Sequence, residues 1–230
     1  MSLPIDRHGS RIRSLCRRSR TVILLGETAC GKTTRVPQML LTSRERIVCT
    51  QPRRIAAISS AHHVADERGC ECGTEVGYCV RFEHKYNSET RLVYMTDGML
   101  LREAISSPNL FSFSTVILDE VHERTLQTDV LLAVVKRAQT LREKDSLKPL
   151  RIILMSATMD VDLLQAYFGM CPVLYLCGRE FRTRVYHCVE DQRKNYVEAS
   201  LRTLDHLHRS KPKNQGVLVF LTGQEEIESL

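Results

Sequence analysis

Residues 26–34 read Gly26-Glu27-Thr28-Ala29-Cys30-Gly31-Lys32-Thr33-Thr34, and this stretch decides the fold. It follows the apolar run 21–25 and precedes the amphipathic run 35–41. The pattern G-x-x-x-x-G-K-[ST] between a strand and a helix is typical of a phosphate-binding loop. Such a loop binds anions because its backbone N–H groups and the positive end of the following helix face one concave site. The alternative is a chance turn rich in Gly and Thr, and the strand–loop–helix context argues against it.

The loop predicts a nucleotide site that uses Mg²⁺. Lys32 is expected to reach the β- and γ-phosphates, and the Thr33 hydroxyl to bind the metal ion. Asp119-Glu120-Val121-His122 ends the apolar run 115–118 and has the form of a Walker B motif. Asp119 would hold Mg²⁺ through water opposite Thr33, and Glu120 would polarise the attacking water as general base. By itself, Asp-Glu at a strand end is weak evidence, because acidic residues also cap helices.

Composition and charge narrow the class of protein. Hydrophobic residues make up 43% of the 230 residues, aromatic residues only 6%, and Trp is absent, so the core must be mostly aliphatic, as in α/β sheets. No apolar run is long enough to span a membrane, and residues 1–20 lack a hydrophobic signal core. The net charge of +6 is compatible with a polyanionic partner without demonstrating one.

The nine cysteines are scattered and odd in number, which predicts reduced thiols in the nucleus, nucleolus or cytoplasm. Cys70 and Cys72 with His62-His63 upstream match no usual zinc spacing, so zinc is the disfavoured alternative. At the N-terminus, Ile12, Leu15 and Cys16 recur at helical spacing among arginines, which predicts a short amphipathic helix over the sheet edge. Nuclear localisation or RNA contact is the alternative for those arginines.

Apolar runs alternate with helical patterns along most of the chain. Strands are expected at 21–25, 46–50, 91–95, 115–118, 151–155 and 173–176, and helices at 32–41, 53–68, 98–105, 126–139 and 161–168. This alternation predicts an α/β fold with a parallel sheet and helices on both faces. Ligands bind at the carboxyl ends of such strands. Five polar motifs directly follow predicted strands, so they are expected to meet at one edge of the sheet.

After Gly178 the pattern changes, which divides the chain into a domain at 1–178 and a second segment at 179–230. Residues 179–184 are polar and resemble a linker. A new alternation follows, with strands expected at 185–189 and 217–221 and a helix near 196–208. These elements are too few to bury the faces of a sheet, so the segment is interpreted as the start of a second domain.

The ordered set of motifs resembles the DEAH-box RNA helicases of superfamily 2. The resemblance rests on residues 26–34, Thr50-Gln51-Pro52-Arg53-Arg54, Gly77-Tyr78-Cys79-Val80-Arg81-Phe82, Thr96-Asp97-Gly98-Met99-Leu100, Asp119-Glu120-Val121-His122-Glu123-Arg124, Ser156-Ala157-Thr158 and Phe220-Leu221-Thr222-Gly223-Gln224. It implies two RecA-like domains, the second incomplete here, with ATP between them. It also implies translocation along RNA in the 3′-to-5′ direction, and an RNA, helicase-activator or ribonucleoprotein partner rather than a membrane.

The resemblance also implies roles for individual residues. Lys32, Thr33, Asp119 and Glu120 would bind and cleave Mg·ATP within the loop 26–34. His122 would couple the nucleotide site to the facing domain, and Ser156 and Thr158 would link hydrolysis to RNA-driven movement. RNA phosphates would be held near Arg53, Arg54, Thr96 and Asp97. Arg53 and Arg54 are alternatively a solvated helix start, although arginine at a helix N-terminus calls for an anion.

The sequence departs from the family pattern in four places, and all but the tolerable apolar change at Val121 alter the expected activity. Ala29-Cys30 replaces the usual Gly-Ser, and His63 replaces an arginine that stacks on the base, so nucleotide affinity is expected to fall. Val121 replaces the usual Ala. No Gln-Arg-x-Gly-Arg-x-Gly-Arg segment supplies an arginine finger, which is worth about 10³–10⁵ in rate. The chain is therefore expected to bind ATP and RNA but hydrolyse ATP slowly. The alternatives are a truncated, non-catalytic RNA- or nucleotide-binding module and a phosphate-loop ATPase unrelated to nucleic acid.

Overall fold

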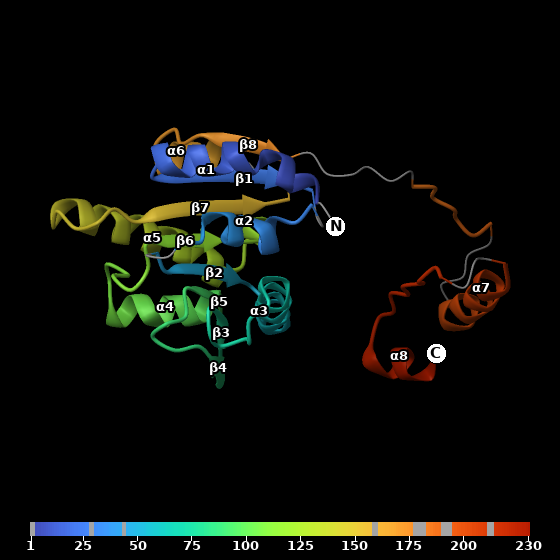
Figure 1. The fold of residues 1–230 in the computed structure, drawn as a ribbon. Helices are drawn as coiled ribbons and strands as arrows, with labels where there is room; N and C mark the ends of the chain where they lie inside the picture. Colours follow the sequence, from blue (N-terminus) through green and yellow to red (C-terminus); the bar gives the residue numbers. More distant parts are fainter. Residues whose placement is uncertain are drawn as a thin grey trace. The chain divides into compact units, whose positions relative to one another are not determined.

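The computed structural model describes residues 3–27, 30–42, 45–157, 161–176, 183–189, 195–210 and 214–230. The chain forms two compact units, Met1–Glu180 and Phe181–Leu230 (Figure 1). In the described part of the chain, no helix combines the length and apolar character needed to cross a membrane.

The first unit is built on an eight-stranded sheet with the order β4-β3-β5-β2-β6-β7-β1-β8. Only β4 runs antiparallel, in a hairpin with β3; the other neighbours pair in parallel. This confirms the predicted α/β fold, which is consistent with a RecA-like domain. The strands are β1 (Thr21–Gly26), β2 (Ile47–Gln51), β3 (Val76–Val80), β4 (Glu83–Lys85), β5 (Leu92–Thr96), β6 (Thr115–Leu118), β7 (Arg151–Ser156) and β8 (Val173–Leu176).

Helices cover both faces of this sheet because alternate residues of each strand point to opposite sides. In β1, Leu24 packs with the helices α1, α2 and α3, whereas Ile23 packs with α4, α5 and α6. Burial of aliphatic side chains in these two layers is the main stabilising contribution. The helices are η1 (Pro4–His8), α1 (Gly9–Arg18), α2 (Lys32–Leu40), α3 (Arg54–Arg68), α4 (Asp97–Ser106), η2 (Val121–Glu123), α5 (Leu126–Lys144) and α6 (Val161–Phe168).

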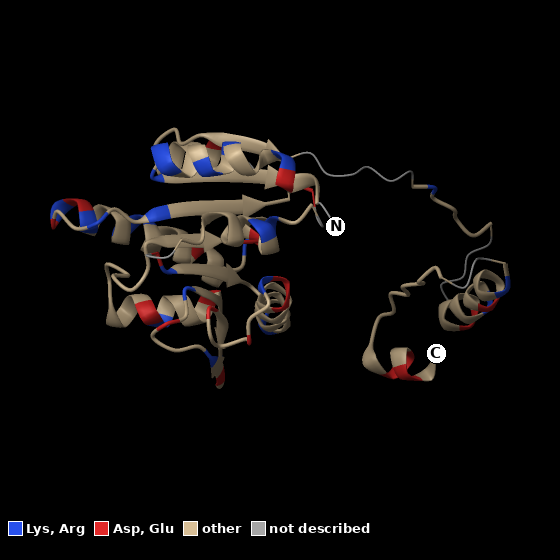
Figure 2. Cartoon of the chain, in the orientation of Figure 1, with Lys and Arg blue, Asp and Glu red and all other residues tan. Residues whose placement is uncertain are grey.

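The N-terminal helix α1 agrees with the amphipathic helix that the sequence predicts. Ile12 and Cys16 are buried, and α1 packs on α2 and β1. Several turns of this helix carry basic residues (blue in Figure 2); the exposed arginines are Arg11, Arg13, Arg17 and Arg18. The apolar face of the helix therefore covers part of the sheet, while its arginines face solvent.

The hairpin of β3 and β4 is absent from the predicted strands. β4 has only three residues, all of them exposed and polar, so it carries no hydrophobic alternation. Short charged strands of this kind are common at sheet edges, where they discourage pairing with other chains. β4 thus closes one edge of the sheet without a hydrophobic signal in the sequence, whereas β3 is a buried strand that the prediction missed.

The second unit contains α7 (Tyr196–Ser210) and α8 (Gln224–Ser229). The strands predicted at 185–189 and 217–221 are wrong, because neither segment forms a strand in the described residues 183–189 and 214–230. A strand needs a neighbour for its backbone N–H and C=O groups, and the described part of this unit offers no sheet to join. No residue of α7 or α8 is buried. These elements therefore lack a closed core in the described part of the unit.

Candidate nucleotide site at the carboxyl edge of the sheet

The polar motifs gather at one edge of the sheet. β5, β2, β6, β7 and β1 are consecutive parallel neighbours, so their carboxyl ends meet along the same side. Each of these strands leads directly into one of the five motifs that the sequence singles out. The sheet order therefore brings together segments that are up to 130 residues apart (residues 26 to 156).

The loop after β1 turns into α2 through Gly31, whose backbone is left-handed with φ 98° and ψ 14°. Glycine adopts this conformation without the penalty that a Cβ imposes. A Cβ at this position would also lie 2.8 Å from a side-chain carbon of Leu3. The turn directs the N-terminus of the nine-residue helix α2 toward the sheet edge. Thr28 and Ala29 of the loop lie outside the described residues.

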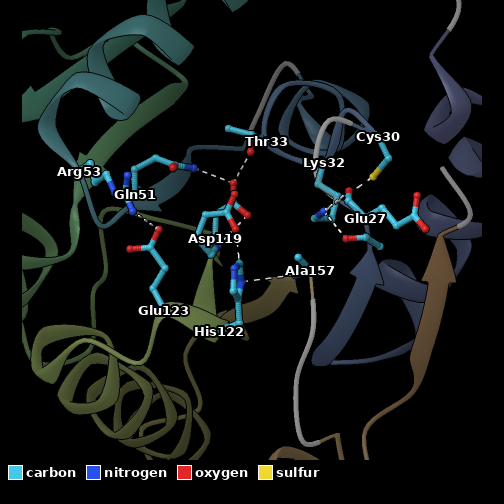
Figure 3. Close-up of polar contacts among 12 residues, drawn as sticks. Glu27, Cys30, Lys32, Thr33, Gln51, Arg53, Asp119, His122, Glu123 and Ala157 are labelled. Atoms are coloured by element: carbon cyan, nitrogen blue, oxygen red, sulfur yellow. Dashed lines mark hydrogen bonds and ion pairs between the residues drawn. The ribbon is translucent and has the colours of Figure 1, made fainter. Parts of the chain in front are cut away.

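Lys32 is folded into its own loop (Figure 3). Its Nζ donates to the carbonyl of Gly26 at 2.5 Å and to that of Glu27 at 2.8 Å. The Cys30 thiol, which stands where the family pattern has Ser, lies 3.8 Å from the same ammonium group. Lys32 is only 5% exposed, so its charge is held inside the loop. Thr34, the last loop residue, lies in the first turn of α2, where its carbonyl accepts from the Gln38 side chain at 3.0 Å.

Thr33 and Asp119 meet as the sequence predicts. The Thr33 hydroxyl donates to Asp119 Oδ2 at 2.5 Å, and Gln51 Nε2 donates to the same oxygen at 2.6 Å. The backbone N–H of Glu120 donates to Asp119 Oδ1 at 2.9 Å. Burial raises the pKa of Asp119 to about 6, although the hydrogen bond from Thr33 opposes that shift. A cation beside this buried carboxylate would favour its ionised form.

His122 bridges Glu120 and the segment that follows β7. Its Nδ1 lies 3.4 Å from Glu120 Oε2 and 3.4 Å from the backbone nitrogen of Ala157 (Figure 3). One ring nitrogen cannot serve both partners at once, since it must carry a proton to donate to Glu120 and lack one to accept from Ala157. His122 therefore has two alternative pairings within the first unit. Its predicted role toward a facing domain stays a prediction.

Arg53 and Arg54 each face a carboxylate. Arg53 Nη2 donates to Glu123 Oε1 at 3.1 Å, and Arg54 Nη2 lies 3.5 Å from Glu83 Oε2. These carboxylates supply the anions that arginine at the start of α3 calls for. Both arginine side chains remain at least half exposed, at 75% and 51%. Their ion pairs are therefore in reach of solvent and of a competing phosphate.

Thr96 and Asp97 form the start of α4. Thr96 precedes the helix in an extended conformation, and no side-chain hydrogen bond caps the helix there. The Asp97 carboxylate is 1% exposed, and Thr128 Oγ1 donates to its Oδ2 at 2.6 Å. Burial raises the pKa of this carboxyl group. A phosphate contact at this segment would therefore use its backbone or Thr96 rather than the Asp97 side chain.

The other predicted site residues are Ser156, Thr158 and His63, and only two of them lie in the described part of the chain. Ser156 is buried at the end of β7, whereas Thr158 lies outside the described residues. His63 is exposed on α3, with Nε2 3.6 Å from Glu67 Oε1. The same carboxylate pairs with Arg35 of α2 at 3.1 Å. The contact of His63 with Glu67 therefore points to the side of α2 and not to the loop itself.

The arrangement fits a nucleotide phosphate with Mg²⁺. Hydroxyl and carboxylate oxygens are ligands that Mg²⁺ accepts, and Thr33 and Asp119 provide both kinds. The N-terminus of α2 and the Lys32 ammonium group present positive charge at the loop. Mg²⁺ would be held from Thr33 and Asp119, with Glu120 beside them, and the phosphates by residues of the loop.

Two residues at this edge were missing from the predicted set. Gln51 bonds directly to Asp119, and the hydroxyl of Tyr94 donates to the Thr33 carbonyl at 2.8 Å. The position of Gln51 follows from the parallel pairing of β2 with β6, in which Thr50 lies opposite Leu118. The sequence indicates each strand but not which strands are neighbours, so neither contact had a usable signal.

Comparison with known proteins agrees with this geometry. The profile of the DEAD/DEAH box helicase family matches residues 9–166. The chain is 49% identical over 233 aligned residues to proteins named ATP-dependent RNA helicase DHX33 from Mus musculus and from Homo sapiens. It is 46% identical to the protein of that name from Drosophila melanogaster. Each alignment covers 100% of this chain and 33% of the relative, so the chain spans about one third of the length of these relatives.

Proposed function

Because this chain belongs to the DEAD/DEAH box helicase family, we propose that it is the nucleotide-binding part of an ATP-dependent RNA helicase of the DEAH type. The subtype rests on Asp119-Glu120-Val121-His122, in which only Val121 departs from the pattern. The named relatives, at 46–49% identity, support RNA as the substrate class. Movement in the 3′-to-5′ direction and a second RecA-like domain starting at residue 179 belong to the same proposal.

One observation gives the main support for a nucleotide site. Thr33, from the first turn of α2, and Asp119, from the end of β6, are hydrogen bonded at 2.5 Å although 86 residues separate them. A hydroxyl at a phosphate-loop helix facing an acid at the end of another strand of the same sheet is the arrangement that holds Mg²⁺ in phosphate-loop nucleotidases. When bound, Mg²⁺ would supply the positive charge that offsets the triphosphate and the buried carboxylate.

The residues of this chain have distinct tasks in that reaction. Lys32 exchanges its bonds to the loop carbonyls for bonds to the phosphates, which are stronger because both partners are charged. Glu120 accepts a proton from the attacking water, and its carboxylate is within 3.4 Å of His122 for orientation. Burial of Asp119 excludes water from the side of the site where charge is held.

RNA is proposed to bind near the ends of β2 and β5. Arg53 and Arg54 would exchange their carboxylate partners for phosphates, and Thr96 would add a backbone or hydroxyl contact. Contacts of this kind carry affinity without sequence preference. Location in the nucleus, nucleolus or cytoplasm, and a helicase activator or ribonucleoprotein as protein partner, remain predictions beside this one.

The test is ATP binding by the chain and by Lys32→Ala, with Lys144→Ala, an exposed lysine at the end of α5, as the matched control. We expect Lys32→Ala to weaken binding by at least about tenfold, because a charge-assisted contact is worth on the order of 1.5–3 kcal/mol. Lys144→Ala should bind as the unchanged chain does. Equal ATP affinity of a folded Lys32→Ala variant would refute the assignment of the loop.

A measurement of ATP hydrolysis distinguishes the helicase proposal from the alternative of a non-catalytic binding module. Within these 230 residues there is no arginine-finger segment, so slow turnover is expected of this polypeptide itself. ATPase activity is measured with and without single-stranded RNA. Stimulation by RNA supports the helicase proposal; binding of both ligands without any stimulated hydrolysis would instead favour the non-catalytic RNA- and nucleotide-binding module.

A further inference from the structure

Tyr94 is a fully buried tyrosine in the middle of β5 whose hydroxyl reaches the nucleotide helix. It donates to the carbonyl oxygen of Thr33 at 2.8 Å. The side chain has no exposed surface, and burial raises the pKa of its phenol well above the ordinary value. The hydroxyl therefore keeps its proton and remains a donor throughout the neutral pH range. Neither the sequence motifs nor the proposed reaction uses this residue.

The Thr33 carbonyl needs a donor from outside the helix. In an α-helix the carbonyl of residue 33 accepts from the N–H of residue 37. That residue is Pro37, which lies inside α2 and has no N–H to give. The proline ring also crowds the carbonyl four residues earlier. The neighbouring carbonyl of Gly31 has its regular partner, the N–H of Arg35 at 2.9 Å.

We propose that Tyr94 is a positioning residue of the nucleotide site: its hydroxyl replaces the hydrogen bond that Pro37 removes, and so holds the first turn of α2 with Thr33 facing Asp119. This inference rests on the proposed function, because Thr33 matters only if the site binds a metal–nucleotide. It assigns a role to a buried residue that touches neither substrate nor metal.

Thr33 is held from two directions. Its carbonyl is bonded to β5 through Tyr94, and its hydroxyl is bonded to β6 through Asp119. β5 is itself fixed by β2, where Cys49 lies opposite Tyr94 and Gln51 opposite Thr96. Gln51 then bonds to Asp119 at 2.6 Å, which closes a ring of contacts around the site. Removing the Tyr94 hydroxyl opens this ring at one point and leaves the Thr33 carbonyl without its donor.

Tyr94→Phe isolates the hydroxyl because the ring still fills its place in the core. We expect the Mg²⁺ concentration for half-maximal binding of a fluorescent ATP analogue to rise about fivefold, the value of one hydrogen bond. Binding of the same analogue without Mg²⁺ should be unchanged. A general loss of packing would weaken both, so the difference between the two measurements reports positioning of the metal ligand.

Two further variants sharpen the result. Tyr78→Phe is the matched control, since Tyr78 is a buried tyrosine of the same sheet whose hydroxyl donates to Glu83 at 2.6 Å, away from the loop. It should leave the Mg²⁺ dependence unchanged. Pro37→Ala restores an N–H at the position that normally bonds to the Thr33 carbonyl. Adding Pro37→Ala to Tyr94→Phe should therefore return the Mg²⁺ requirement to within about twofold of the unchanged chain.

A measurement without ligand separates this inference from the proposed function. Amide hydrogen exchange of α2 should become faster in Tyr94→Phe, stay unchanged in Tyr78→Phe, and recover in the double variant. Unchanged exchange and unchanged Mg²⁺ dependence in Tyr94→Phe overturn the inference, as does a double variant that shows no recovery. If the unchanged chain binds no nucleotide, the proposed function fails, and the exchange measurement still decides whether Tyr94 holds α2.

Discussion

Glu120 adopts a left-handed backbone conformation, with φ 53° and ψ 35°, although it is not glycine. The chain turns sharply here after β6, and the Glu120 N–H donates to the carboxylate of Asp119. Non-glycine residues in this region cost on the order of 1 kcal/mol and persist where the surroundings impose them. The strained residue, Glu120, is the one that we assign as general base, and it lies between the proposed metal ligand Asp119 and His122.

Two substitutions of Glu120 distinguish the effect of backbone strain from the effect of losing the carboxylate. Glu120→Gly and Glu120→Ala both remove the carboxylate, but only glycine relieves the left-handed conformation. We expect Glu120→Gly to be about 1 kcal/mol more stable than Glu120→Ala in urea unfolding, and both to lose hydrolysis. An alanine variant as stable as the glycine variant would show that the turn stores no strain.

At the same scale, the sequence predicted which motif residues meet better than it predicted the residues around them. Lys32, Thr33 and Asp119 belong to motifs with fixed spacing, and the structure places Thr33 against Asp119 as expected. Gln51 and Tyr94 reach the same point only because β2 and β5 lie beside β6 in the sheet. Strand order arises from packing of the whole domain, so no local pattern encodes these two contacts.

At the scale of elements, Glu45 and Arg151 tie two strands that are not direct neighbours. Arg151 opens β7 and Glu45 precedes β2, with β6 between them. The guanidinium donates to the two carboxylate oxygens at 2.6 and 3.2 Å. These hydrogen bonds from Arg151 are the largest cause that holds the pKa of Glu45 below its ordinary value of 4.5. The pair clamps the sheet at the end opposite the nucleotide site.

The contribution of the Glu45–Arg151 ion pair to stability should decrease as the pH is lowered. Because the pKa of Glu45 is lower in the folded than in the unfolded chain, its stabilisation is complete above about pH 4.5 and is lost as the pH falls through the folded value. At pH 7 we expect Glu45→Gln to lower the free energy of unfolding by about 1 kcal/mol. The difference should shrink at about pH 3. Glu89→Gln, at an exposed turn, is the control; a pH-independent loss in Glu45→Gln would contradict the clamp.

Many elements of the first unit were predictable from the apolar pattern of the sequence. β6, β8 and α6 begin and end at the predicted residues, and the other strands predicted for the first unit end one residue later than expected. Continuous aliphatic runs bounded by polar residues give this accuracy. The polar strand β4 lacked that signal, and β3 was missed although its five residues are buried. Residues 185–189 and 217–221 had the signal but no sheet to join. A strand is thus fixed by its neighbour as much as by its own residues.

At the scale of the whole molecule, the two units differ in how much apolar surface they bury. The first has two layers of buried aliphatic residues around the sheet. In the second, α7 and α8 bury no residue, and large side chains such as Tyr186 and Phe220 are more than four-fifths exposed. Since burial of apolar surface drives cooperative folding, the first unit should carry nearly all of the stability.

This difference predicts the behaviour of the separated units. A chain ending at Leu176 should retain the thermal transition of the full chain, with a Tm within about 3 °C, because a shift of that size reflects less than about 1 kcal/mol. Residues 183–230 alone should melt without a cooperative transition. Circular dichroism checks both. A cooperative transition in 183–230, or loss of folding in the shorter chain, would contradict this division of stability.

The close contact between Gly26 and Leu176 has a mechanical consequence. A Cβ on Gly26 would lie 2.8 Å from Leu176 Cβ, so the first residue of the phosphate loop touches the last residue of β8. Leu176 is also the point at which the polypeptide leaves the sheet on its way to the second unit. Because these two residues abut, a larger side chain at Gly26 would displace the end of β8 together with the start of the loop that would hold the nucleotide.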